Sequence, residues 1–288
     1  MPKIFPSLFL AAIAFFMISC TQETKEITDY VNPFIGTGGH GHTFPGATLP
    51  FGMVQLSPDT RINDWDGCSG YHYSDSTILG FSHTHLSGTG IGDYGDIRIM
   101  PAVGELRTNP GNASDPGYQS AFSHQKEWAE PAYYRVFLED YQVEVELTTS
   151  ERAGMHRYRF PKSDSAHIII DLTESIVSEK IIDLEINIEN DSTISGKRQG
   201  SSWAINQHIY FVIEFSKPFQ SYGIAENKKL IPGLKKSSEK DIKAWVNFQT
   251  KKDEQILIKV GISAVSIEGA RKNLKLEIPN WDFDALKN

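Results

Sequence analysis

The chain has 288 residues, 40% of them hydrophobic, and a formal net charge of −8. This acidic balance argues against nucleic acid as a partner, because no cluster of Lys and Arg resembles a phosphate-binding patch. The length is enough for one large or two modest domains.

Residues 1–19 are predicted to be a signal peptide. Lys3 supplies a basic start, and the apolar run Leu8–Ile18 is too short to span a bilayer. The run ends in Ser19-Cys20, which resembles a bacterial lipoprotein signal with cleavage before Cys20 and lipidation of its sulfur. The alternative is a secretory signal followed by an incidental cysteine. With lipidation, residues 20–28 form a short tether to the membrane in the bacterial cell envelope, at the periplasm or the outer-membrane surface.

Cys68 is the only other cysteine, so a chain lipidated at Cys20 has no intramolecular disulfide. Its fold must rely on the hydrophobic core. Cys68 is surrounded in sequence by Asp residues and lacks nearby basic groups, so nothing indicates a reactive thiolate.

Residues 32–95 differ from the rest of the chain. They hold 13 of the 23 glycines and five of the nine histidines, together with eight aromatic residues, five Asp and one Arg, but no Lys or Glu. Glycine at this density indicates positive-φ turns and close backbone approaches. Histidine, short carboxylates and aromatic rings can line a polar small-molecule site. We interpret the region as a set of loops lining a groove.

The first of three motifs in this region is Asn32–Gly46, which contains His40 and His42. Its Gly36-Thr37-Gly38-Gly39 run lacks the Gly-Lys-Ser/Thr end of a phosphate-binding loop, and no helix pattern follows it. Two histidines at this spacing could bind a metal only with a third ligand from elsewhere. We expect them to hydrogen-bond substrate hydroxyls or loop backbone.

The second motif, Asp64–Tyr73, places Trp65 between two Asp and before a glycine. A Trp ring can cover the apolar face of a pyranose, while a short carboxylate such as Asp66 accepts its hydroxyl protons. The alternative is that Trp65 anchors the loop to the core and that the Asp side chains cap turns. Both interpretations remain open at this stage.

The third motif, Phe81–Asp96, contains His83, His85 and Asp93. Asp93 and Asp96 suggest a calcium site, because Ca²⁺ prefers clustered oxygen ligands. The acid spacing differs from an EF-hand loop, however, and no bidentate Glu follows. Spacing alone therefore favours a polar binding loop over a metal site.

Beyond residue 130 the hydrophobic pattern has the period of two that is typical of strands. Turn signals such as Gly196, Pro232-Gly233 and Lys252-Asp253 separate the runs. Many strands without a helical pattern between them predict an all-β, antiparallel β-sandwich, spanning residues 29–264. The predicted strands are Tyr133–Phe137, Val143–Leu147, Met155–Phe160, His167–Leu172, Leu184–Ile188, Ile209–Phe215, Ile242–Phe248 and Gln255–Ile262.

Residues 265–288 change character. Ser266 is a suitable N-cap for a helix over about Ile267–Glu277, and Pro279 follows that helix. Asp282 then begins a second helix that reaches only one turn before Asn288. Because one turn cannot stand alone, we expect a helical domain to follow this linker. The alternative is a frayed natural terminus.

Several segments together resemble glycoside hydrolase family 92, with matches from about Asp29 to the last residue. The strongest are Asp29–Thr37, Asp66–Tyr71 and Phe81–Gly90. The others are Phe122–His124, Glu130-Pro131, Glu151-Arg152, His156–Tyr158, Phe215–Phe219, Val260–Ser263, Glu268–Ala270 and Trp281–Asp284.

The resemblance implies an exo-acting, inverting, calcium-dependent α-mannosidase, commonly specific for α-1,2 linkages, acting on mannose-containing glycans. In that family an N-terminal β-sandwich packs against an (α/α)₆ helical domain, and the active site lies between them. The catalytic acid, the catalytic base and the main Ca²⁺ ligands belong to the helical domain, which has no counterpart in these residues. We therefore assign no catalytic residue and no metal ligand to this chain, and we expect it to be inactive alone. Its expected substrate-binding residues are Trp65, Asp66, His83, His85, His40, His42 and Asp93.

Two other functions fit the same residues. A non-catalytic, glycan-binding surface lipoprotein would bind mannosides without hydrolysing them. A self-contained metal hydrolase would use His40, His42, His83 and His85 to hold zinc.

Overall fold

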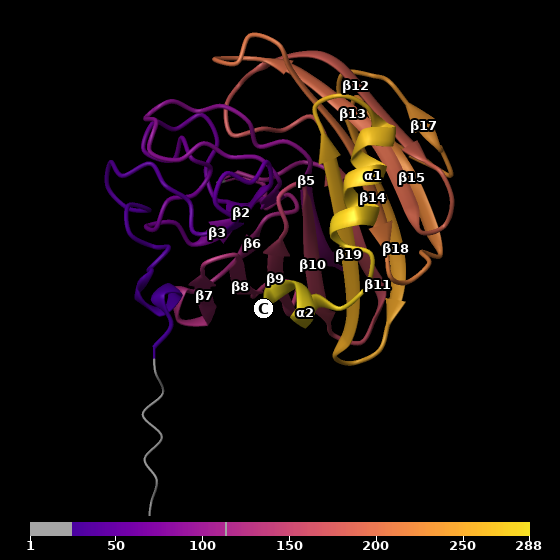
Figure 1. Cartoon of the computed structure of the whole chain (residues 1–288). Helices are drawn as coiled ribbons and strands as arrows, with labels where there is room; N and C mark the ends of the chain where they lie inside the picture. Colours follow the sequence, from indigo (N-terminus) through magenta and orange to yellow (C-terminus); the bar gives the residue numbers. More distant parts are fainter. Residues whose placement is uncertain (1–24, 113) are drawn as a thin grey trace, which may run out of the picture.

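The computed structural model describes residues 25–112 and 114–288 (Figure 1). Within these residues two antiparallel β-sheets face each other and enclose one hydrophobic core. The predicted all-β, antiparallel sandwich is thus confirmed. The predicted signal peptide and Cys20 lie outside the described residues. Over those residues, no helix combines the length and the apolar character that a bilayer crossing requires.

The first sheet has eight strands within the described part of the chain, all paired antiparallel. In spatial order they are β1 (Ala47–Thr48), β2 (Gln55–Asp59), β4 (Gly80–Ser82), β5 (Arg98–Val103), β11 (Ser163–Asp171), β18 (Ile242–Thr250), β15 (Ser221–Glu226) and β16 (Lys229–Pro232).

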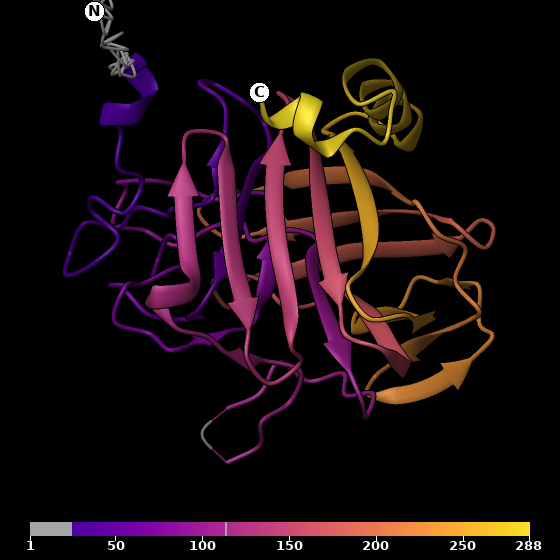
Figure 2. The same ribbon diagram turned by 90° about the horizontal axis from the view of Figure 1, so that it is seen from below.

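The second sheet has nine strands over the same residues, several of which stand side by side in Figure 2. Their order is β17 (Lys236–Ser237), β12 (Lys180–Ile188), β13 (Thr193–Ser201), β14 (Gln207–Phe215), β19 (Glu254–Ser263), β10 (Ala153–Phe160), β9 (Val143–Thr149), β8 (Tyr133–Leu138) and β7 (Glu127–Glu130). A small separate ladder joins β3 (Thr77–Ile78) to β6 (Ser120–Ala121).

Alternating side chains account for the two layers. In β12 the side chains of Leu184, Ile186 and Ile188 are buried, whereas the intervening residues are partly exposed. By contrast, β11 buries three successive residues, Ile168–Ile170, because it lies inside the first sheet and is covered on both faces.

The C-terminal helices form where they are predicted. In α1 (Ile267–Glu277) the Ser266 side chain accepts a hydrogen bond from the Gly269 N–H at 3.0 Å. This helix packs on β19 and β14 of the second sheet (Figure 1). The approach is close: a Cβ on Gly261 would lie 2.5 Å from the Ala270 carbonyl oxygen, so only glycine fits there. Asp282 caps α2 (Phe283–Lys287). Two 3₁₀ turns are η1 (Ile27–Tyr30) and η2 (His124–Lys126).

The glycine-rich region is more ordered than a set of loops. It contributes β1, β2 and β4 to the first sheet, and β3 to the small ladder. The connections between these short strands gather beside the sandwich, where the chain is coloured indigo to purple in Figure 1. This corner of the fold holds the histidine motifs.

Candidate functional site

Trp65 forms an exposed aromatic platform. Its side chain remains 59% accessible, although the indole N–H donates a 2.9 Å hydrogen bond to the Gly90 carbonyl. The ring of His42 meets the indole edge to face, with centroids 4.4 Å apart. Gly90 has a φ of +64°, so a glycine allows this turn beside the two rings. The platform is therefore held in place while part of it stays open to a ligand.

A histidine–carboxylate pair lies beside the platform. The His40 Nδ1 lies 2.5 Å from Asp66 Oδ1, and the His40 ring centroid lies 5.2 Å from that of Trp65. A carboxylate can only accept, so the His40 Nδ1–H donates and its Nε2 is left free. The second oxygen of Asp66 has no hydrogen-bond partner among the described residues. These groups offer acceptors next to an aromatic face.

His42 completes this group. Its φ of +56° turns the backbone sharply, and its carbonyl accepts a 2.6 Å hydrogen bond from the Gly88 N–H. The Nε2 atom is buried and has no partner within the part of the chain that the structure describes. The structure thus brings four of the predicted site residues together: Trp65, Asp66, His40 and His42.

His83 lies elsewhere, fully buried between the two sheets. Its Nδ1–H donates to the Ile97 carbonyl at 2.8 Å, so its Nε2 accepts from the Nε2–H of His156 at 3.0 Å. The Nδ1 of His156 in turn accepts from the Tyr158 hydroxyl at 2.8 Å. Burial lowers the pKa of His83 to about 4 and that of His156 well below its usual range. Both rings are therefore neutral and structural in this arrangement.

His85 also belongs to a buried network. Its Nε2 is 2.8 Å from Asp59 Oδ1, and the other Asp59 oxygen accepts from Arg98 Nε at 2.8 Å. The Nδ1 of His85 bonds to the Gln55 carbonyl at 2.7 Å. Burial acts to raise the pKa of Asp59, but Arg98 and His85 outweigh it, so the net shift is downward. Both ring nitrogens of His85 are occupied.

Asp93 is buried and joins two distant loops. One of its oxygens accepts from the Ala204 N–H at 2.5 Å, and the other accepts from the Tyr94 N–H at 3.0 Å. Its neighbour Asp96 is engaged as well, because it accepts from the Thr84 hydroxyl at 2.5 Å and from Arg198 at 2.8 Å. Among residues 25–112 and 114–288, no group of three or more His, Cys, Asp or Glu side chains could hold a metal ion. The described residues do not fit a Ca²⁺ site, and the four histidines of the zinc hypothesis do not gather.

Cys68 is buried, and burial raises the pKa of its thiol. A raised thiol pKa reduces the thiolate fraction, which agrees with the absence of basic neighbours in its sequence.

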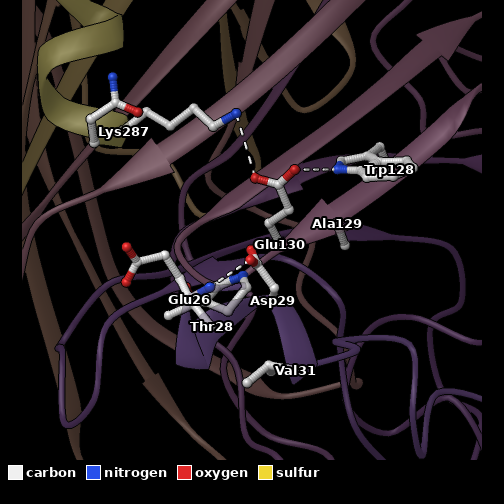
Figure 3. A pocket seen from close by; sticks show the side chains of 10 residues that line it. Glu26, Thr28, Asp29, Val31, Trp128, Ala129, Glu130 and Lys287 are labelled. Atoms are coloured by element: carbon white, nitrogen blue, oxygen red, sulfur yellow. Dashed lines mark hydrogen bonds and ion pairs between the residues drawn. The ribbon is translucent and has the colours of Figure 1, made fainter. Parts of the chain in front are cut away.

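A cavity of about 600 Å³ lies away from these residues, between η1, β7 and the end of α2 (Figure 3). The Trp128 indole N–H donates to Glu130 at 2.6 Å, and the Lys287 ammonium lies 3.5 Å from the same carboxylate. None of the predicted site residues lines this cavity.

Comparison with known protein families shows which family the chain belongs to. Residues 30–263 match the glycosyl hydrolase family 92 N-terminal domain. The chain belongs to glycosyl hydrolase family 92.

Solved structures of family 92 agree with this assignment. An α-mannosidase from Bacteroides thetaiotaomicron, in complex with mannoimidazole, is 42% identical and superposes with a TM-score of 0.87 over 91% of this chain and 36% of that one. An inverting mannosidase from the same species is 27% identical, with a TM-score of 0.78 over 92% of this chain and 35% of that one.

Among proteins compared by sequence, an uncharacterized secreted glycosidase from Arthroderma benhamiae is 26% identical across 98% of this chain and 39% of its own length. This family 92 chain therefore spans little more than a third of these relatives.

Proposed function

We propose that this chain forms one wall of the mannose-binding site of an exo-acting α-mannosidase. The single observation that carries this function is the Trp65 platform with Asp66 and His40 at its edge. An aromatic face covers the C–H side of a pyranose, while adjacent acceptors bind its hydroxyl protons. The mannosidases that the chain is similar to support mannose as the sugar.

In this proposal Trp65, Asp66 and His40 touch the terminal mannose, while the buried His42 supports the Trp65 ring from its edge-to-face position. A different role is proposed for three other residues that the sequence analysis assigned to substrate binding, namely His83, His85 and Asp93. Their polar atoms are buried and already hydrogen-bonded to protein, so they do not contact the sugar. They fix the loops that carry the contacting residues. This agrees with the rule that buried polar groups in native proteins are paired.

The catalytic acid and base are proposed to come from a helical domain outside this chain. Inversion requires two carboxyl groups about 6.5–9.5 Å apart with a water between them. The buried carboxylates of this chain already accept hydrogen bonds from Arg side chains or backbone N–H groups, as seen for Asp59, Asp93 and Asp96. They are therefore poor candidates for the catalytic acid and base. We also propose that Ca²⁺ is held mainly by the helical domain, since no described cluster here fits it. When bound, it would supply electrostatic stabilisation at the sugar.

The same proposal includes preference for α-1,2 linkages and export with lipidation at Cys20. The secreted relative supports export. The lipoprotein signal in the sequence supports anchoring at the cell envelope.

Ligand-observed NMR on the full chain tests the binding function, with methyl α-mannoside as ligand and methyl β-galactoside as control. We expect saturable binding of the mannoside alone. A parallel incubation with α-1,2-mannobiose should release no mannose. Binding of neither glycoside would overturn the proposed sugar wall, and mannose release at enzymatic rates would overturn the assignment of the catalytic groups to another domain.

A further inference from the structure

The connection between β11 and β12, residues 172–179, contacts the loop that leads into Trp65. The Asn63 N–H donates to the Ile176 carbonyl at 2.8 Å, and the Asn63 side-chain oxygen accepts from the Ser178 N–H. Ser178 lies 115 residues further along the chain than Asn63. These two hydrogen bonds therefore tie the backbone just before Trp65 to a distant segment of the fold.

The same connection also packs against the third motif. The Ile176 N–H donates to the Tyr94 carbonyl at 3.3 Å. Gly95 has a φ of +87°, and a Cβ there would lie 2.7 Å from the Ile176 nitrogen, so this approach requires glycine. The third motif carries Gly90, whose carbonyl accepts from the Trp65 indole. The connection thus supports both the loop that precedes the Trp65 ring and the loop that anchors it.

One buried guanidinium fixes the two ends of this connection. Arg198 of β13 is fully buried, and its Nε donates at 2.9 Å to the carbonyl of Leu172, where the connection begins. Its Nη2 pairs with the carboxylate of Glu179, where the connection ends. Its Nη1 donates to Asp96, at the end of the third motif. Because charge-assisted hydrogen bonds are about twice as strong as neutral ones, the connection is a firm support for Asn63.

The backbone of Asn63 suits this junction. Its φ of +56° lies in the left-handed region, which Asn and Asp adopt more readily than other residues that carry a side chain. Asn63 thus makes the turn before Trp65 and also supplies the two hydrogen bonds to the connection. If those bonds are lost, fewer molecules hold the indole in place before a ligand arrives, and the apparent affinity falls by the same fraction.

We infer that Asn63 is a positioning residue for the Trp65 platform. It joins the Trp65 loop to the connection that Arg198 fixes, and it holds the indole in its binding orientation without touching the sugar. The inference rests on the proposed function for the identity of the ligand. The order of the indole, by contrast, can be measured in the absence of any ligand.

The test compares Asn63→Ala with Asn63→Asp, which keeps a side-chain oxygen as acceptor and tolerates the same φ. The matched control is Asn227→Ala, because Asn227 is also exposed and has a φ of +50°. It lies in the turn between β15 and β16, at the other edge of the first sheet from β1. Two quantities are measured on the full chain by NMR: the affinity for methyl α-mannoside and the hydrogen-exchange rate of the Trp65 indole N–H, assigned with Trp65→Phe.

We expect Asn63→Ala to weaken mannoside binding roughly fivefold, the value of about one lost hydrogen bond, and to speed indole exchange by a similar factor. Asn63→Asp should stay within about twofold of the unmodified chain in both measurements. Asn227→Ala should change neither quantity, although it also removes an Asn from a left-handed turn.

Unchanged indole exchange in Asn63→Ala would overturn the inference. Equal changes in Asn63→Ala and Asn227→Ala would overturn it too, because the effect would then come from a general loss of stability. A loss in Asn63→Asp as large as that in Asn63→Ala would show that the side-chain acceptor does not position the loop. If the unmodified chain bound no mannoside, the proposed function would fall, while faster indole exchange in Asn63→Ala alone would still support the positioning role.

Discussion

The buried pair His83 and His156 predicts a steep loss of stability in mild acid. In the unfolded chain both imidazoles take a proton with a pKa of about 6.5. In the folded chain burial holds the pKa of His83 at about 4 and that of His156 well below its usual range. Between these limits the unfolded state binds more protons, so stability is full above about pH 6.5 and falls as the pH is lowered toward 4.

The magnitude follows from the width of that window. Each histidine that must stay neutral costs about 1.4 kcal/mol per pH unit below 6.5. At about pH 5 the pair therefore costs roughly 4 kcal/mol, a large share of the 5–15 kcal/mol that typically stabilises a domain. The variant His83→Gln/His156→Gln removes both titrating groups and keeps amide donors and acceptors toward Ile97 and Tyr158.

Urea unfolding at about pH 7 and about pH 5 measures this effect as the free energy of unfolding. The unmodified chain should lose roughly 4 kcal/mol more than the double variant over that interval. Circular dichroism at the higher pH confirms that the variant retains the sandwich. If both proteins lose the same free energy, the neutral His83–His156 pair does not govern the acid response.

Three further predictions concern the supports of the fold. Arg98→Met leaves the buried Asp59 carboxylate without its Arg partner and should lower the free energy of unfolding in urea by about 3–5 kcal/mol. Arg107→Met, at an exposed ion pair, should cause no measurable change. Equal losses in the two variants would contradict the role of burial. Ser266→Ala removes the α1 cap and should cost about 1 kcal/mol in the same assay, and an unchanged midpoint would show that the cap is dispensable. Cys68 should resist a thiol reagent in the native chain at neutral pH and react fully in urea, because burial raises its pKa; rapid native labelling would refute its burial.

The strands and helices that local patterns encode could be predicted. Alternating apolar residues specified β8, β9 and β12, and the Ser266 cap specified the start of α1. By contrast, β13 (Thr193–Ser201) gave no such signal, because its buried positions include Arg198 and Gly196 in place of large apolar side chains. The energy that permits a buried Arg there comes from Asp96, which is 102 residues away in the sequence.

In the candidate site, too, some residues could be predicted from local sequence and others depend on contacts between distant segments. The composition of residues 32–95 indicated Trp65 with its neighbouring acid and histidines, and the structure gathers them. The His-x-His pair at residues 83 and 85 looks the same in sequence as the pair at 40 and 42, yet it is buried. What distinguishes it is the partner His156, 73 residues further along the chain. Such pairings depend on the tertiary fold, so spacing alone could not reveal them.

If Trp65 is the platform of a mannose-binding wall, its removal should weaken mannoside binding far more than removal of another exposed Trp. Methyl α-mannoside affinity is measured by NMR titration for Trp65→Ala and for Trp128→Ala, which removes another exposed Trp on β7. Trp65→Ala should lower the affinity roughly tenfold, from about 1.5 kcal/mol of aromatic contact, and Trp128→Ala less than about twofold. Unchanged binding by Trp65→Ala, or equal losses in both variants, would contradict it.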